Sequence, residues 1–291
     1  MPSAHAGRMA NIKHILVATD LSDRSERACE RGIRLARERA ATVDLLHVVE
    51  GGLRAQVQER RRALAEEHLR DWFVSVPETE RPGVRFSVET GDPFAVILER
   101  AQERNAGLIV LGEPGKKGLK DLFVGTTAER VVRHSDRPVL IVRQTAPGAY
   151  RRVLVAIDFS EGASRALDVA YEVAPGAEFL AVHAWQVPPV GLATRQAVEK
   201  AMEEENRLLG RRIERQAHDH LVATASRPRA PRVDMREGNA FFVIREAMTS
   251  FRPDLLAMGT HARSGIAVAM VGSLAREFLA EAPCDVLVAR A

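Results

Sequence analysis

The chain has little of what marks secreted, disulfide-bonded or membrane proteins. Among its 291 residues there are two cysteines, Cys29 and Cys284, and they form no CxxC pair. This favours a reducing compartment without disulfides. No apolar run approaches the roughly 18 residues that a membrane helix needs, and Met1–Ala10 lacks the apolar core of a signal peptide. We therefore expect a cytoplasmic protein that does not engage a membrane.

Several motifs of familiar enzymes and binding proteins are missing as well. The sequence contains no GxxxxGK[ST], no GxGxxG after its first apolar run and no GxSxG. Their absence argues against Walker-type, dinucleotide-binding and hydrolase-elbow sites. His218 and His220 are two residues apart in a predicted helix and do not share a face, so we expect no metal site there. The net charge is +3 without a long basic block, which argues against nucleic-acid binding.

The chain contains one glycine motif that occurs in both halves. Gly112-Glu113-Pro114-Gly115 is followed nine residues later by Gly125-Thr126, and Gly259-Thr260-His261-Ala262 is followed nine residues later by Gly272-Ser273. The offsets 259 − 112 and 272 − 125 are both 147. Shorter matches run before them, such as 14–20 with 152–158 at an offset of 138. A domain-sized repeat indicates a duplication, not a solenoid.

The repeat and the apolar pattern together predict two α/β domains. The domains span 11–143 and 151–290, and 144–150 is a Pro/Gly-containing linker. Short apolar runs suit strands buried on both faces, and strict alternation with helices predicts parallel sheets. The strands are expected near 13–19, 43–49, 84–89, 107–112, 138–142, 152–157, 178–184, 231–236, 254–259 and 285–289. The helices are expected near 23–39, 54–75, 93–105, 126–134, 161–174, 192–225, 239–250 and 272–281.

Helix starts carry their own signals. Ser22 or Asp23 is expected to cap the first helix, with Glu26 completing a capping box, and Ser160 is expected to cap its counterpart in the second half. His47 and His183 fall inside strand patterns, so they are expected to be core or edge histidines rather than ligands. These local signals support the predicted order of elements.

The glycine pattern predicts a phosphate site. Gly112 and Gly259 end strands, and ligands of open parallel sheets bind beyond the carboxyl ends of strands. Glycine permits close backbone approach and positive φ, and the helix that follows offers free N–H groups to an anion. Asp20 and Asp158 end the first strand of each half, where a carboxylate can accept hydrogen bonds from ribose or adenine. The rival interpretation is that the glycines only form turns and the aspartates only cap helices.

The pattern G-x2-G-x9-G-[ST], preceded by a strand and followed by Ala128-Glu129-Arg130-Val131, resembles the universal stress protein family in its tandem form. The resemblance covers nearly everything from Lys13 to Arg290. It implies two five-stranded parallel α/β domains (adenine nucleotide alpha hydrolase-like) with strand order 3-2-1-4-5. It also implies that the last strands, Val139–Val142 and Val286–Val288, pair within the chain as a pseudo-dimer. Whether two chains then form a homodimer stays open.

The resemblance also implies ATP sites, because many family members bind ATP and some do not. The first site would comprise Asp20, Val48, Gly112, Gly115, Gly125 and Thr126. The second would comprise Asp158, Ala184, Gly259, Ala262, Arg263, Gly272 and Ser273. A bound triphosphate usually brings Mg²⁺, so ATP alone and ATP with Mg²⁺ both stay open.

Each copy departs from the family pattern in its glycine loop. In the first copy Glu113-Pro114 replaces the usual pair of a small residue and His, and Lys116, Lys117 and Lys120 are expected to offset the carboxylate of Glu113. Ala262 replaces the second glycine of the other loop, which costs about 1 kcal/mol if positive φ is needed there. The two sites are therefore not expected to be equal.

Two classes of function follow. The leading one is a cytoplasmic stress protein that binds ATP as a structural or signalling ligand, with slow hydrolysis at most because no Walker lysine or clear general base is present. The alternative is a nucleotide-independent scaffold or binding module, in which the glycine loops are turns and the long segment Leu192–Ala225 contacts a partner.

Overall fold

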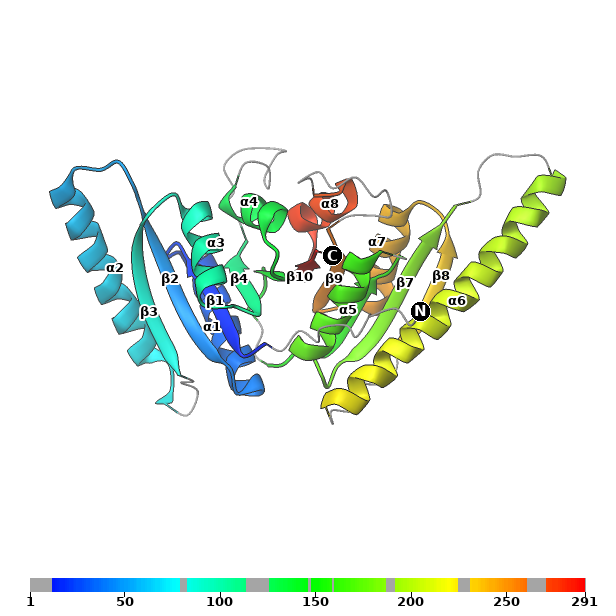
Figure 1. Cartoon of the computed structure of the whole chain (residues 1–291), viewed down its shortest axis with the longest axis horizontal. Coiled ribbons are helices and arrows are strands. Elements are labelled where there is room, and N and C mark those ends of the chain that lie inside the picture. Colours follow the sequence, from blue (N-terminus) through cyan, green and yellow to red (C-terminus); the bar gives the residue numbers. More distant parts are fainter. Residues whose placement is uncertain are drawn as a thin grey trace, which may run out of the picture.

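The computed structural model describes residues 12–78, 83–113, 126–145, 148–158, 160–186, 192–224, 231–260 and 271–290. Strands and helices alternate along both halves, as the sequence predicts (Figure 1). The first half contains β1 (His14–Thr19), α1 (Asp23–Arg39), β2 (Thr42–Glu50), α2 (Ala55–Ser75), β3 (Val84–Gly91), α3 (Pro93–Glu103), β4 (Leu108–Gly112), α4 (Thr127–His134) and β5 (Val139–Val142). The second contains β6 (Arg152–Ala156), α5 (Glu161–Val173), β7 (Glu178–Trp185), α6 (Leu192–Thr224), β8 (Arg232–Glu237), α7 (Ala240–Phe251), β9 (Leu255–Gly259), α8 (Ser273–Glu281) and β10 (Asp285–Ala289).

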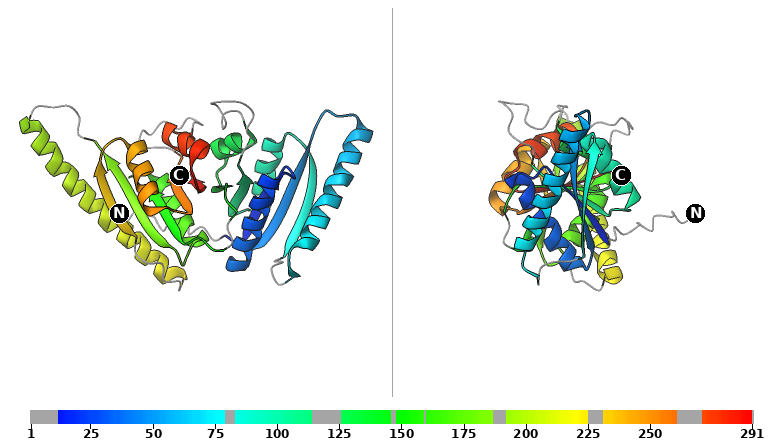
Figure 2. Two further views of the ribbon diagram at one scale, coloured as in Figure 1. Left: turned by 180° about the vertical axis from the view of Figure 1, so that it is seen from behind. Right: turned by 90° about the vertical axis from the view of Figure 1, so that its left-hand side faces the viewer.

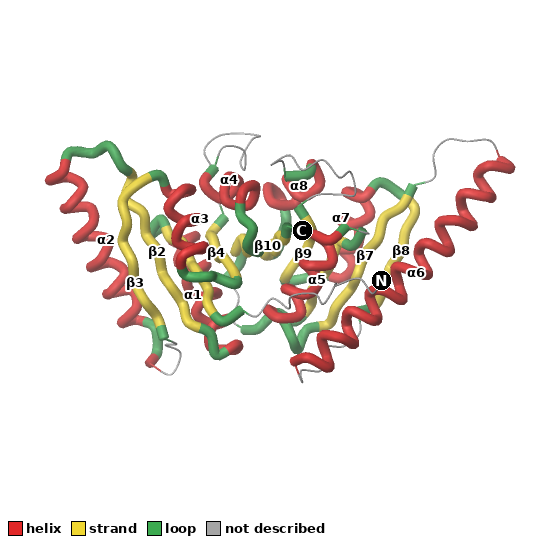
Figure 3. The backbone as a smooth tube through the Cα atoms, in the orientation of Figure 1, coloured by secondary structure: helices red, strands yellow, loops and turns green. Residues whose placement is uncertain are grey.

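The strands form one sheet that runs through both halves (Figure 3). Its order is β3-β2-β1-β4-β5-β10-β9-β6-β7-β8, so each half has the predicted order 3-2-1-4-5. Pairs within a half are parallel, whereas β5 and β10 pair antiparallel with Leu140 opposite Leu287. The expected pairing of the last strands is therefore present. It closes the edge that each half would expose alone, which leaves β3 and β8 as the outer edges.

Helices cover both faces of the sheet because successive strand residues point to opposite sides. Val17 of β1 belongs to the apolar cluster shared with α1 and α5, whereas its neighbour Leu16 belongs to the cluster shared with α3, α4, α7 and α8. The long helices α2 and α6 lie at the two outer ends of the molecule and pack against the α1 and α5 face (Figures 1 and 2). The continuous apolar runs of the sequence are thus explained by strands buried on both sides.

The first helix begins as expected at Ser22, but the capping box uses a different partner. The backbone N–H of Ser25 donates to Ser22 Oγ (3.4 Å), and Ser25 Oγ reciprocates by accepting from Ser22 N (3.0 Å). The proposed role of Glu26 is therefore wrong, because Ser22 rather than Asp23 is the N-cap and Ser25 is then the third helical residue. Ser160 caps α5 as expected, accepting from Ala163 N at 3.1 Å.

The long helix α6 accounts for the extra length of the second half. Its buried residues Leu209 and Ile213 join the cluster on the α5 face. Gln216 Nε2 donates to Ser164 O (2.6 Å) and to Asp168 Oδ1 (2.7 Å), so this part of α6 is fixed to α5.

A buried polar cluster joins the halves beside the β5–β10 pair. Asp285 Oδ1 accepts the backbone N–H groups of Arg143 (2.8 Å) and Gln144 (3.1 Å), and Oδ2 accepts the Tyr150 hydroxyl (2.6 Å). The Arg31 Nε lies 3.5 Å from the same Oδ2, and the two side chains are 3% and 1% exposed. Burial raises the pKa of Tyr150 well above its usual value, and the negative charge of Asp285 adds to this. The cluster fixes both ends of the predicted linker.

Candidate functional site

Each half has a switch point where the direction of its strand order reverses. In the first half β1 and β4 are adjacent, with Ala18 opposite Leu111. The helices that follow them lie on opposite faces, since α1 packs in one apolar cluster and α4 in the other. The second half repeats this with β6 and β9. Such a switch point is where open α/β sheets bind ligands, and both predicted sites lie at one.

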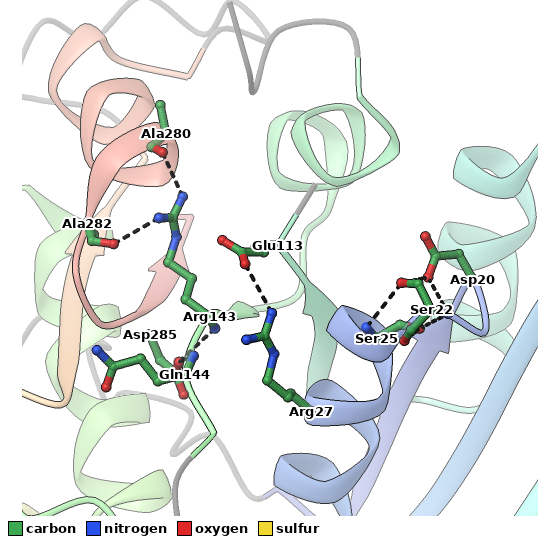
Figure 4. A network of polar contacts seen from close by, with 10 residues as sticks. All are labelled: Asp20, Ser22, Ser25, Arg27, Glu113, Arg143, Gln144, Ala280, Ala282 and Asp285. Atoms are coloured by element: carbon green, nitrogen blue, oxygen red, sulfur yellow. Dashed lines mark hydrogen bonds and ion pairs between the residues drawn. The ribbon is translucent and has the colours of Figure 1, made fainter. Parts of the chain in front are cut away.

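Asp20 lies at this edge and is held in place by the start of α1 (Figure 4). Its Oδ1 accepts Ser22 N at 3.1 Å and also accepts the Ser22 hydroxyl. Partial burial would raise the pKa of Asp20, but hydrogen bonds from Ser22 and Ser25 outweigh it and hold the pKa below its usual value. Asp158 repeats the backbone contact, with Ser160 N at 2.8 Å. Both carboxylates therefore hold the turn that leads into the following helix, and each keeps acceptor capacity for further hydrogen bonds.

Gly112 and Gly259 are needed for packing. A Cβ at Gly112 would lie 2.9 Å from Arg24 O and 3.1 Å from Ser25 Cα. A Cβ at Gly259 would lie 2.8 Å from Ala163 N. The first turn of α1 or α5 thus approaches the end of the neighbouring strand so closely that only glycine fits. Neither glycine has positive φ; among the described glycines that conformation occurs at Gly52, Gly91 and Gly238.

The end of β2 contributes Val48, as expected, and the end of β7 contributes Ala184. Both residues are half-buried against the cluster on the α3 and α7 face. His47 Nδ1 donates to Thr19 O (2.9 Å) and His183 Nδ1 contacts Ile157 O (2.8 Å), in line with the expectation of edge histidines. A groove of about 520 Å³ opens beside the end of β2, and Val48 and Leu64 are among the residues that line it.

The helices that follow the two glycine loops do not begin at equivalent residues: at the offset of 147, α8 begins one residue earlier than α4. Thr126 is the N-cap of α4, and its Oγ1 accepts Glu129 N at 3.1 Å. In α8 the N-cap is Gly272, without a side-chain cap, and Ser273 is the first helical residue. The Thr126 oxygen is therefore engaged by its own helix.

Glu113 is neutralised by a residue that the sequence did not single out. Arg27 Nη2 lies 3.1 Å from Glu113 Oε1, and both side chains are 28% exposed (Figure 4). The expected partners Lys116, Lys117 and Lys120 lie outside the described residues. Arg27 has a counterpart in Arg165, 138 positions later, so the repeat itself held a signal for this residue.

Four predicted site residues lie outside the part of the chain that the structure describes: Gly115, Gly125, Ala262 and Arg263. The remaining nine are placed at the carboxyl edges of the two half-sheets. Within the described residues, no group of three or more His, Cys, Asp or Glu side chains has the arrangement of a metal site. None of the described helices is both long enough and apolar enough to cross a membrane.

Comparisons with known proteins agree with this architecture. The family model described as "Universal stress protein family" matches residues 11–143 and 149–290. The universal stress protein MJ0531 of Methanocaldococcus jannaschii is 35% identical over 140 residues, which are 45% of this chain and 82% of the relative. Universal stress protein YxiE of Bacillus subtilis is 31% identical over 144 residues, covering 44% of this chain and 97% of YxiE.

A solved structure supports the fold over the whole length. The crystal structure of a universal stress protein from Archaeoglobus fulgidus superimposes with a TM-score of 0.66 at 21% identity, covering 96% of this chain and 98% of that one.

Proposed function

Because the chain belongs to the universal stress protein family, we propose that it binds ATP at the switch points of its two halves and acts as a nucleotide-linked regulator of the stress response in the cytoplasm. The observation that carries this proposal is that Asp20 follows β1 and Gly112 ends the adjacent strand β4 at one switch point, and that Asp158 follows β6 and Gly259 ends β9 in the same way. A carboxylate after one strand and a helix N-terminus after the other are groups that suit a ribose and a phosphate.

The charge distribution predicts different ATP affinities for the two sites. In the first half Arg27 already pairs with Glu113, so an incoming phosphate meets a compensated carboxylate. In the second half the equivalent position is Thr260, which carries no charge, but α8 lacks a side-chain cap. Removal of the carboxylate by Glu113→Gln should therefore free Arg27 for the phosphates and strengthen binding at the first site.

A second function is equally compatible with the glycine contacts. Gly112 is required by the approach of α1 whether or not a phosphate binds, so these glycines would also be present in a nucleotide-independent scaffold. In that case α6 would provide the contact surface for a partner. Binding measurements separate the two functions, whereas the presence of the glycines does not.

The deciding experiment is mass spectrometry of small molecules released by denaturing the freshly purified chain, followed by calorimetric titration with Mg-ATP and with ATP in EDTA. The wild-type chain is compared with Gly125→Val, with Gly272→Val and with the double variant. The proposal expects one or two equivalents of ATP, lost in the double variant. No binding by the wild-type chain, or unchanged binding by the double variant, would favour the scaffold. Any hydrolysis is expected to be slow.

A further inference from the structure

The last strand of each half ends in an arginine that reaches the other half. Arg143 follows β5, and its Nη1 donates to Ala282 O (2.8 Å) at the end of α8. Its Nη2 donates to Leu279 O at 2.8 Å, and also to Ala280 O at 2.8 Å (Figure 4). Arg290 follows β10, and its Nη1 donates to Arg133 O in the last turn of α4 at 3.4 Å. Arg143 thus binds three carbonyls at the C-terminal end of α8, and Arg290 binds one at the C-terminal end of α4. Because α4 and α8 follow the predicted phosphate-binding loops, we call them the phosphate helices.

The backbone just before each arginine is bonded to the site of its own half. Glu113, directly after Gly112, donates its backbone N–H to Val142 O at 3.0 Å, and Arg143 is the next residue. Thr260, directly after Gly259, donates to Ala289 O at 3.0 Å, and Arg290 is the next residue. The same chain of contacts therefore runs from each site toward the helix of the other.

The helices between these contacts and the sites are short. α4 has 8 residues and α8 has 9, so a guanidinium at the last turn lies about two turns from the N–H groups at the first. A cation at a helix C-terminus complements the helix dipole, and bonds to several carbonyls fix the tilt of the axis. The direction of the N-terminal N–H groups then depends on the arginine of the other half.

We propose that Arg143 and Arg290 are positioning residues that orient the phosphate helices α8 and α4 across the junction of the halves, and so couple the two nucleotide sites. The inference rests on the proposed function. Coupling between sites is reciprocal in free energy, so ATP in either half should strengthen or weaken binding in the other by the same factor.

The test uses variant chains in which only one of the two sites can still bind ATP. In the Gly125→Val chain only the second-half site remains, and Arg143→Met is expected to weaken ATP there about fivefold, whereas Arg290→Met leaves it unchanged. In the Gly272→Val chain only the first-half site remains, and Arg290→Met is expected to weaken it, with a smaller effect because it makes a single longer bond. Arg143→Lys keeps the charge without the fork and should fall between.

This crossed pattern is what a general loss of stability would not produce. If each arginine affects only its own half, or both halves equally, the inference is wrong while ATP binding stands. If the unmodified chain binds no ATP, the proposed function fails and the inference with it.

A second measurement needs no arginine variant. In the Gly272→Val chain, ATP can occupy only the first half, and hydrogen exchange is followed with and without Mg-ATP. The inference expects slower exchange of amides in α8, which belongs to the other half. Protection confined to the first half would overturn it, even if the arginine variants do not fold.

Discussion

Asp285→Asn should destabilise the chain strongly, because it removes the charge that balances the buried Arg31. The two side chains are 3% and 1% exposed. Asparagine keeps an oxygen that can accept the backbone N–H groups of Arg143 and Gln144. The change therefore removes only the ion pair and the oxygen that accepts the Tyr150 hydroxyl. Breaking a buried pair by removing one partner usually costs about 3–5 kcal/mol. We expect about 3 kcal/mol off the free energy of unfolding.

The assay is urea unfolding followed by tryptophan fluorescence, because each half contains one tryptophan. Trp72 lies in α2 and Trp185 in β7, so Trp185→Phe and Trp72→Phe chains report the halves separately. Coincident transitions are expected in both, since the sheet is continuous, and coincidence is required before a two-state free energy is extracted. Asp285→Asn should lower both midpoints.

A double-mutant cycle separates the charge from simple packing. Arg31→Met combined with Asp285→Asn removes both ionised partners, and its loss should be well below the sum of the two single losses. Arg37→Met changes an exposed arginine of the same helix and should cost less than about 1 kcal/mol. A loss below about 1 kcal/mol for Asp285→Asn, or strict additivity in the cycle, would refute the reasoning.

Three further outcomes follow from single positions. Gly112→Ala should lower the unfolding free energy by about 1–3 kcal/mol, because the added Cβ would lie 2.9 Å from the backbone of α1. Gly176→Ala is the control: its added Cβ would meet no atom within 4 Å, so it should be near neutral in the same urea assay. The lowered pKa of Asp20 stabilises the fold above its unfolded-state pKa of about 4, and this stabilisation is lost as the pH falls further. Asp20→Asn should therefore flatten the acid limb of a plot of unfolding midpoint against pH, and an unchanged limb would contradict it. Burial raises the pKa of Cys29 and of Cys284 to about 12, so neither thiol should react with Ellman's reagent at pH 8 until urea unfolds the chain, and rapid labelling of the native chain would be inconsistent with this.

Much of the fold could be predicted from the sequence because its signals are local or repeated. The helix cap at Ser160 and the buried strands were recognised from neighbouring residues. The duplication was recognised from an offset of 147 shared by two glycine pairs. The capping partner of Ser22 was misjudged, because Ser22 and Asp23 are both good caps and a shift of one residue moves the partner from Glu26 to Ser25.

The candidate site was only partly predictable. The positions of Asp20 and Gly112 follow from the strand order, because the carboxyl ends of parallel strands share one edge of the sheet. The partner of Glu113 did not follow from the sequence. Three lysines lie close to Glu113 in the chain, whereas its partner Arg27 is 86 residues away. The sequence predicted that Gly112 allows a phosphate to approach the backbone. The close approach that the structure describes is that of α1.

The sequence by itself determined the order of elements, the two-fold repetition and the family, because these depend on periodicity and on residues close together in the chain. The family resemblance also implied that the last strands pair, but only the tertiary structure decided which side chains join the halves beside that pair. Tyr150 and Asp285 are 135 residues apart, and Asp285 aligns with Pro138 of the other copy at the offset of 147, so the repeat held no signal for this contact. Hydrogen bonds and ion pairs between distant residues depend on how the sheet brings their backbones together, and that placement is a property of the whole fold.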